Sequence, residues 1–127
     1  MNKMGFEYTQ KTKDNFLHPK NMGEIKNPSG TGEVGSPACG DIMKIDLEIE
    51  HNKIIDIKFK TFGCAAAIAS TSVLTQIAKR KTLTEAKKLT MKDVEKELGE
   101  LPQIKKHCAA MSVEALKKAI KDYEERN

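Results

Sequence analysis

The residues best suited to chemistry in this chain are its three cysteines, each of which stands beside a glycine or a histidine. Thiolate is the form of cysteine that binds metals or attacks sulfur. A tetrahedral zinc ion and a two-iron cluster each take four protein ligands. We therefore predict that three thiols, a carboxylate and an imidazole converge on one metal or iron–sulfur site. The predicted site residues are Cys39, Asp41, Cys64, His107 and Cys108, with Gly40 and Gly63 beside them.

The fourth ligand of this site stays open between Asp41 and His107. A carboxylate oxygen is a harder ligand than a thiolate and suits iron–sulfide less well, so a cluster held in this way should be exchangeable. The cysteines are 25 and 44 residues apart in sequence, which matches no Cys-x-x-Cys finger. The alternative to a metal site is that the three cysteines are small buried core residues and the histidine lies on the surface.

Two segments of alternating apolar and charged residues, 43–50 and 55–60, predict a β-hairpin. Pairing Ile49 with Ile55 through a three-residue turn keeps the apolar side chains on one face. This register brings the start of the first strand, with Asp41, beside the second cysteine. Asp41 is also in phase with the apolar face, where a carboxylate is costly unless it is paired or bound.

Helical patterns follow the hairpin. We predict a helix over about residues 65–80, a short helix after Thr82, another over about residues 90–99, and a final helix over about residues 108–125. The second and third cysteines then fall at helix N-termini, where the helix dipole favours thiolate. A hairpin followed by helices is typical of an α+β domain, with the helices on one face of a small antiparallel sheet of about three strands.

The rest of the chain indicates one domain over residues 21–127, preceded by a polar segment, residues 1–20, with a short helix over about residues 8–17. Residues 21–40 carry five glycines and two prolines. This composition predicts a mobile loop, with a short strand near Glu33.

Composition argues against several classes of function. The net charge is only +4, lysine and glutamate are interleaved, and there are six aromatic residues and no tryptophan. We therefore expect no nucleic-acid partner. The longest apolar run, residues 64–69, is too short to cross a bilayer, so no membrane association is expected. A polar N-terminus and an odd number of cysteines favour a reducing, cytoplasmic location over a secreted disulfide framework.

Several short motifs occur in a defined order along nearly the whole chain. They are residues 18–23, 32–41, 59–64, 67–72, 81–83 and 105–108. In these motifs the chain resembles the IscU/NifU-type scaffold family, on which iron–sulfur clusters are assembled, over about residues 16–126. The resemblance implies a SufE/NifU-like fold and a scaffold or carrier, rather than an enzyme with turnover of its own.

The resemblance also implies partners and residue roles. The scaffold would receive sulfur from a cysteine desulfurase and iron from an iron donor, build a labile [2Fe–2S] cluster, and pass it to apo acceptor proteins. The sulfur-accepting candidates are Cys108, Cys39 and Cys64, and Asp41 is the carboxylate tied to cluster lability. Lys105 matches the family's lysine before the His-Cys pair, and Zn2+ often occupies the same site in family members.

Two departures from family patterns bear on partners and alternatives. Many bacterial relatives carry Leu-Pro-Pro-Val-Lys where this chain has Gln103 and Ile104 at the third and fourth positions, which argues against a dedicated Hsp70-type chaperone. Relatives of the SufU type have an insertion before the third cysteine and lack the histidine. A zinc-dependent sulfurtransferase or persulfide carrier of that type is the alternative function, and a structural zinc domain is a third.

Overall fold

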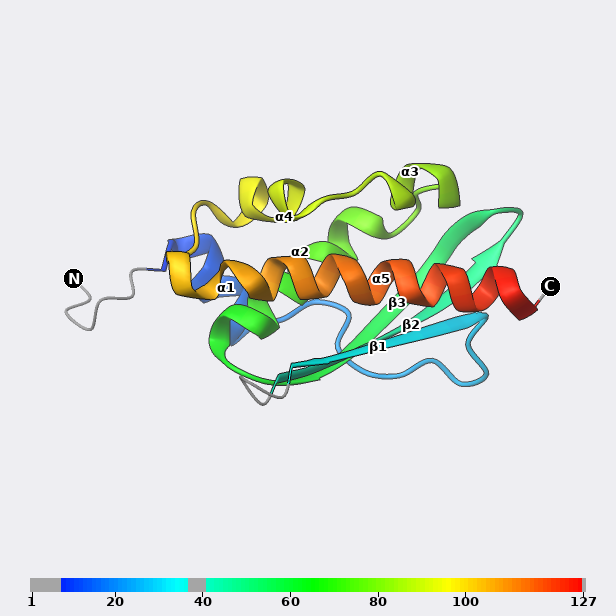
Figure 1. Ribbon diagram of the computed structural model, residues 1–127, viewed down its shortest axis with the longest axis horizontal. Helices are drawn as coiled ribbons and strands as arrows, with labels where there is room; N and C mark the ends of the chain where they lie inside the picture. The colour runs from blue at the N-terminus through cyan, green and yellow to red at the C-terminus, as the bar shows by residue number, and fades with distance from the viewer. Residues whose placement is uncertain (1–7, 37–40, 127) are drawn as a thin grey trace.

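The computed structural model describes residues 8–36 and 41–126, which form a sheet covered on one face by helices (Figure 1). Three antiparallel strands lie in the order β1-β2-β3, so the predicted α+β class is confirmed. The elements are α1 (Gln10–Leu17), β1 (Gly30–Ser36), β2 (Asp41–Glu50), β3 (Lys53–Phe62), α2 (Ala65–Ala78), α3 (Leu83–Lys87), α4 (Met91–Leu98), the 3-10 helix η1 (Gln103–Lys105) and α5 (Lys106–Arg126).

The β2–β3 hairpin has the predicted register along most of its length, with Ile45 opposite Phe59. Near the turn the prediction is wrong, because a bulge shifts the pairing and Ile49 lies opposite Ile54. Ile54 is therefore fully buried, whereas Ile55, which was expected on the apolar face, is 38 % exposed. A bulge of this kind accommodates one extra residue on one strand without disturbing the register beyond it.

The turn itself has two residues rather than the expected three. His51 and Asn52 both have positive φ angles, 54° and 60°, as in the mirror-image turns that match the twist of paired strands. Asparagine tolerates this left-handed conformation well. The shorter turn is the physical reason for the bulge, because the strands must regain the register set by their apolar faces.

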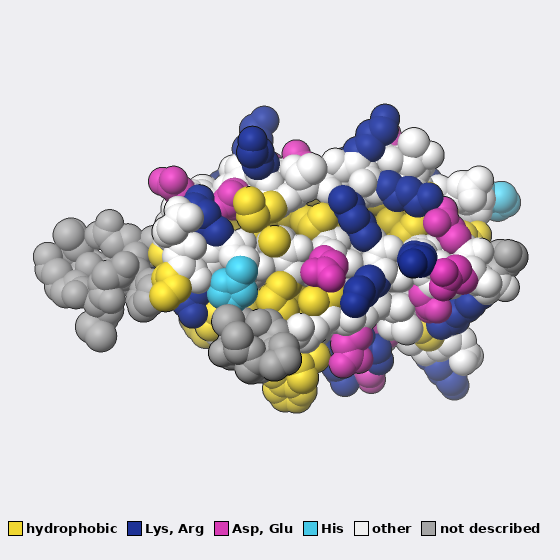
Figure 2. Space-filling view, in the orientation of Figure 1, with side chains coloured by type: hydrophobic (Ala, Val, Ile, Leu, Met, Phe, Trp, Pro, Cys, Tyr) yellow, Lys and Arg dark blue, Asp and Glu magenta, His cyan; other side chains and the backbone are white. Residues whose placement is uncertain are grey.

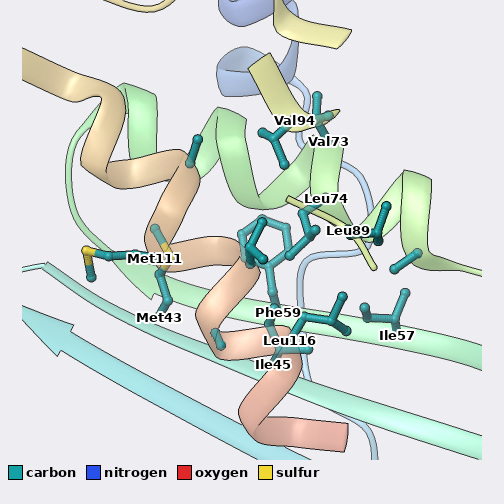
Figure 3. Packing of buried hydrophobic residues seen from close by; sticks show 14 of the residues in the cluster. Met43, Ile45, Ile57, Phe59, Val73, Leu74, Leu89, Val94, Met111 and Leu116 are labelled. Atoms are coloured by element: carbon teal, nitrogen blue, oxygen red, sulfur yellow. The ribbon is translucent and has the colours of Figure 1, made fainter. Parts of the chain in front are cut away.

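The hydrophobic core lies between the inner face of the sheet and the helices α2 and α5 (Figure 3). Met43, Ile45 and Phe59 from the sheet meet Leu74 of α2 and Leu116 of α5, and each is at most 1 % exposed. Burying a side chain of this size contributes about 1.5–3 kcal/mol. This shared core fixes the positions of α2 and α5, the helices at whose N-termini the second and third cysteines occur.

Strand β1 packs directly against the backbone of α5 because two inward-facing positions are glycines. A Cβ atom at Gly30 or at Gly32 would lie 2.3 Å from a carbonyl oxygen of α5, which is much closer than such atoms approach. The N–H of Thr31 donates a hydrogen bond to Asp122 Oδ2 of α5, at 2.9 Å. The strand expected near Glu33 is thus longer than its sequence pattern indicated.

Helix α1 joins the helical layer through polar contacts with α2 and α4. Thr9, its N-cap, donates a hydrogen bond to the carbonyl of Leu98 at the end of α4. Asn15 Oδ1 accepts one from Ser72 Oγ of α2, at 2.8 Å. The helix expected over residues 8–17 is present from residue 10. The domain boundary at residue 20 stays a prediction.

Charged side chains of both signs are spread over the surface, and Figure 2 shows Lys and Arg with Asp and Glu between them on the face that carries α5. Several form ion pairs, as when Lys44 and Lys60 both contact Glu24, at 3.3 and 3.1 Å. Such exposed pairs contribute little to stability. Over the described part of the chain, no helix combines the length and apolar character needed to span a membrane.

Candidate metal and cluster site

Two of the three cysteines lie together at the end of the sheet remote from the hairpin turn. Cys64 is the N-cap of α2, and Cys108 is the third residue of α5. Their Sγ atoms are 3.8 Å apart, well beyond the roughly 2.05 Å of a disulfide bond, so the pair is not joined by a disulfide. Cys108 is buried and Cys64 is partly exposed, so the pair is accessible from one side.

The surroundings of Cys64 stabilise its thiolate. Its pKa is lowered to about 5, chiefly by a hydrogen bond from the Cys108 thiol. The backbone N–H groups of Ala67 and Ala66, and the charge of Lys105, lower the pKa further, whereas burial raises it. Because Cys64 is the N-cap of α2, its sulfur lies at the positive end of the helix dipole, which favours the thiolate. At neutral pH Cys64 is therefore ready to bind a metal or attack sulfur.

Lys105 and Tyr8 lie within electrostatic reach of the thiol pair. The pKa of Lys105 is raised, mainly by the negative charge of Cys64. The pKa of Tyr8 is raised first by burial and then by Cys64. Lys105 belonged to the expected site, but Tyr8 did not. Its only signal in the sequence is an aromatic residue just before α1, and its approach to the thiols depends on how α1 docks on α4.

His107 is held by the backbone so that one ring nitrogen is directed toward the cysteines. Its Nδ1 lies 3.1 Å from the carbonyl oxygen of Ile104, in η1. A carbonyl only accepts, so Nδ1 carries a proton, and in the neutral imidazole Nε2 has the free lone pair. Nε2 lies 3.7 Å from Cys108 Sγ. Ligating histidines are commonly oriented by such a bond from the opposite nitrogen, and the sequence pattern did not indicate this carbonyl.

The start of α5 is anchored to α4 by an ion pair next to the site. Lys106 Nζ lies 2.9 Å from Glu95 Oε2, and the two side chains are only 26 % and 15 % exposed. Partial burial shields such a pair from solvent screening. Because Lys106 immediately precedes His107, this contact fixes the backbone that carries the imidazole and the third thiol.

The other predicted ligands lie partly or wholly outside the described residues. Cys39 and Gly40 fall in the segment that the structure does not describe. The backbone of Asp41 begins β2 and lies opposite Ser36 of β1, but its side chain is not described. Gly63 is exposed, next to Cys64. Among the described residues alone, no group of three or more His, Cys, Asp or Glu side chains is arranged to hold a metal ion.

The described part of the site consists of two thiol sulfurs and an imidazole nitrogen, with a cationic side chain nearby. Thiolate and imidazole ligands suit zinc and iron–sulfur clusters, whereas calcium and magnesium require oxygen. The pair at Cys64 and Cys108 thus fits a metal ion or cluster that completes its coordination with further ligands. It also fits covalent sulfur chemistry, because a thiolate is a good nucleophile toward a persulfide or disulfide.

Comparison with known proteins identifies the class. Residues 7–127 match the family described as "NifU-like N terminal domain", and the chain belongs to this family. The "Iron-sulfur cluster assembly scaffold protein IscU 1" of Archaeoglobus fulgidus is 48 % identical over 120 residues, covering 94 % of this chain and 78 % of the relative. The "Iron-sulfur cluster assembly scaffold protein IscU" of Aquifex aeolicus is 47 % identical over 122 residues, with the same coverage of each chain.

Solved structures share the fold. A nitrogen-fixing NifU-like protein (N-terminal) from Brucella abortus superposes with a TM-score of 0.74, at 19 % identity, over 94 % of this chain and 95 % of the other. A putative scaffold protein for the SUF system from Fervidobacterium islandicum has the same TM-score at 24 % identity, covering 89 % of this chain and 96 % of the other. At these identities the likeness shows the fold alone.

Proposed function

We propose that this chain is a scaffold for the assembly of iron–sulfur clusters, with the cluster as cargo rather than as a resident cofactor. It would accept sulfur from a cysteine desulfurase and iron from a donor, build a [2Fe–2S] cluster, and release it to apo acceptor proteins. Zn2+ would occupy the same ligands in the absence of iron. The scaffold would have no turnover of its own, so it is a carrier and not an enzyme.

The observation that carries the proposal is the thiol pair itself. Cys64 and Cys108 come from helices far apart in sequence, yet their sulfur atoms are 3.8 Å apart beside the Nε2 of His107. A cysteine that only fills space in a core can stay a neutral thiol. The pKa of Cys64, lowered to about 5, therefore supports a chemical role for its thiolate. Cys39 and Asp41 are proposed to complete the ligand set, with Asp41 and His107 as alternatives for the fourth position.

Sulfur would enter by exchange at one of the thiols, for which Cys108, Cys39 and Cys64 are the candidates. The acceptor thiolate attacks the outer sulfur of a persulfide on the donor protein. A new S–S bond forms, the donor's S–S bond breaks, and the donor cysteine leaves as a thiolate. Release of sulfide from the new persulfide takes two electrons, which a thiol reductant such as dithiothreitol supplies.

Anaerobic reconstitution tests the scaffold function directly. The chain is incubated with ferrous iron, cysteine, a cysteine desulfurase and dithiothreitol, followed by absorption spectroscopy and by analysis of iron and sulfide. We expect a labile chromophore with equal amounts of iron and sulfide, which is lost in Cys64→Ser and in Cys108→Ser. His107→Ala should weaken it, whereas His51→Asn, at the opposite end of the sheet, should not. A colourless product with all components present would exclude the scaffold function.

The role of Asp41 can be tested separately. If this carboxylate makes the cluster exchangeable, Asp41→Ala should hold its cluster longer than the wild type in the presence of a chelator. Faster loss from the variant would show that Asp41 stabilises the cluster instead.

A zinc-dependent persulfide carrier of the SufU type remains the second candidate function, and the retained imidazole beside Cys108 favours the scaffold over it. The carrier would hold one tightly bound Zn2+ and accept persulfide without forming a coloured cluster. Metal and sulfide analysis of the reconstituted protein distinguishes the two, because the scaffold would contain iron and sulfide whereas the carrier would contain zinc and no sulfide.

A further inference from the structure

The outer face of the sheet, opposite the helices, carries an apolar hollow beside the cysteine end. The hollow is about 660 Å3 in volume and extends from β1 across β2 to β3. Its apolar lining consists of Met22, Ile42 and Phe62, which are 46 %, 41 % and 77 % exposed. We call it the outer-face hollow. Large apolar side chains gathered in this way on a surface commonly mark a contact site for another molecule.

The outer-face hollow borders β1, an edge strand of the sheet. Alternate residues of an edge strand direct their N–H and C=O groups away from the neighbouring strand. Thr31 does so in β1, because its N–H bonds to Asp122 of α5. By the same alternation, Glu33 and Gly35 present their backbone groups outward, and no backbone partner from another described segment reaches them.

The opposite edge of the sheet is contacted at Phe59 by another segment of the chain. Met22 forms a bridge to Phe59 of β3, with hydrogen bonds from Phe59 N–H to the Asn21 carbonyl and from Gly23 N–H to the Phe59 carbonyl, at 2.9 and 2.8 Å. An extended segment on a strand edge is therefore a contact this sheet already uses. Within the described residues, the stretch of β1 at Glu33 and Gly35 is a place where a further segment can be added.

Charge and shape both favour an extended partner segment. Gly35 has no side chain, so a residue paired with it can extend over the strand and reach Ile42. Lys44 and Lys60, at the rim of the outer-face hollow, are both paired with Glu24. Glu33 has no ion pair with another described residue. The complementary segment therefore carries a lysine or arginine opposite Glu33 and a large apolar side chain near Gly35.

We propose that an extended segment of the sulfur-donating protein pairs with β1 at Glu33 and Gly35 and places an apolar side chain in the outer-face hollow. This inference rests on the proposed function. Sulfur exchange requires direct contact between two sulfur atoms, so the donor must bring its own cysteine to the scaffold's thiols. β1 leads in sequence toward Cys39, so a segment that extends the sheet here is already directed toward the cysteines.

A second copy of this chain is a poorer occupant than the sulfur donor. Two β1 edges paired with one another would bring both Glu33 carboxylates onto the same small patch, and like charges on neighbouring strands are destabilising. Light scattering measures this alternative. A dimer of the wild type that dissociates on Ile42→Glu would overturn the proposal.

The test uses a purified cysteine desulfurase as the probe and measures its binding to the full chain. Ile42→Glu places a charge in the outer-face hollow and should weaken binding at least about tenfold. Ile55→Glu is the matched control, because Ile55 is an isoleucine of similar exposure, 38 % against 41 %, near the hairpin turn. The control should bind within about twofold of the wild type. Glu33→Lys should weaken binding by a smaller factor.

Hydrogen exchange measures pairing at β1 directly, which a change in affinity alone does not. Binding of the desulfurase should slow the exchange of the Glu33 and Gly35 amides, because pairing engages these N–H groups. Absence of protection at both amides would overturn the proposal, as would equal weakening by Ile42→Glu and Ile55→Glu, or no binding by the wild type. If circular dichroism shows that Ile42→Glu is unfolded, Met22→Ser replaces it.

A separate experiment tests the proposed scaffold function independently of desulfurase binding. Reconstitution of the wild type with ferrous iron and inorganic sulfide, without desulfurase, asks only whether the thiols hold a cluster. A wild type that takes no cluster but still binds the desulfurase at β1 would contradict the scaffold function and leave the docking surface in place.

Discussion

The two ends of the β2–β3 hairpin are covered in different ways. At the turn end, the backbone of Ile54 bonds to Lys81 and Arg80, at 2.9 and 2.8 Å, and its side chain is fully buried. At the cysteine end, Phe62 and Ile42 are 77 % and 41 % exposed and together line the outer-face hollow, whereas Ile55 near the turn, 38 % exposed, does not line it. One end of the same hairpin thus contributes stability, while the other leaves apolar surface and reactive sulfur open to contact.

The largest expected effect concerns the thiol at the cysteine end. Because the pKa of Cys64 is lowered to about 5, the residue should be nearly all thiolate at pH 7, against about one to three per cent for an ordinary cysteine. Its alkylation by iodoacetamide should therefore vary little around neutral pH and fall as the pH drops through about 5. Peptide mapping in a Cys39→Ser background isolates this rate in the metal-free chain.

Cys108→Ala is the matching control for that profile. It removes the hydrogen bond that contributes most to the lowered pKa of Cys64, so the midpoint should move to higher pH. A wild-type midpoint between about 8 and 9, the range of an ordinary thiol, would show that the site does not activate Cys64.

The second effect is on stability at the turn end. Ile54→Ala removes a side chain with no exposed surface and should lower the free energy of unfolding by about 2–5 kcal/mol. Urea titration followed by circular dichroism measures the loss. The alkylation rate of Cys64 in the folded variant should be unchanged. A loss below about 1 kcal/mol would mean that the core relaxes around the missing side chain.

A smaller effect is expected at the cap of α3. Thr82 accepts a hydrogen bond from Glu85 N–H at 3.1 Å, and its own N–H bonds to the Glu85 carboxylate at 2.9 Å. Thr82→Ala breaks the first of these bonds and should cost about 1 kcal/mol of unfolding free energy. Thr82→Ser, which keeps the hydroxyl, serves as the control in the same urea titration.

The smallest effect should come from the exposed aromatic residue at the cysteine end. Phe62→Ser removes a side chain that is 77 % exposed and should change the unfolding free energy by no more than about 0.5 kcal/mol. A loss comparable to that of Ile54→Ala would erase the contrast between the two ends. The residue would then have to be regarded as part of the core.

How far the sequence determines this structure is clearest in the hairpin. The alternation along β2 and β3 was sufficient to pair Ile45 with Phe59, because a one-residue slip would turn a whole face to water. It could not choose between Ile54 and Ile55, since two adjacent isoleucines give the same pattern and only the turn geometry separates them. Local periodicity therefore fixes the register away from the turn but not within it.

The site divides in the same way. The meeting of Cys64 and Cys108 was predicted from the shared chemistry of the three cysteines at the boundaries of elements. The approach of Tyr8 could not be predicted, because it depends on the docking of α1 against α4 through Thr9 and Leu98. The contact of the Ile104 carbonyl with His107 could not be predicted either, because every residue type has a backbone carbonyl. Contacts made by backbone or by distant elements are those that sequence patterns omit.

The close packing of Gly30 and Gly32 on α5 has a mechanical consequence. With no side chain between them, strand and helix cannot slide or separate without losing direct backbone contact. Helix α5 carries His107 and Cys108 at one end, and β1 leads toward Cys39. A rigid pair of elements thus connects two segments that carry predicted ligands and are distant in sequence. A displacement of either segment should therefore move β1 and α5 together and shift the other segment as well.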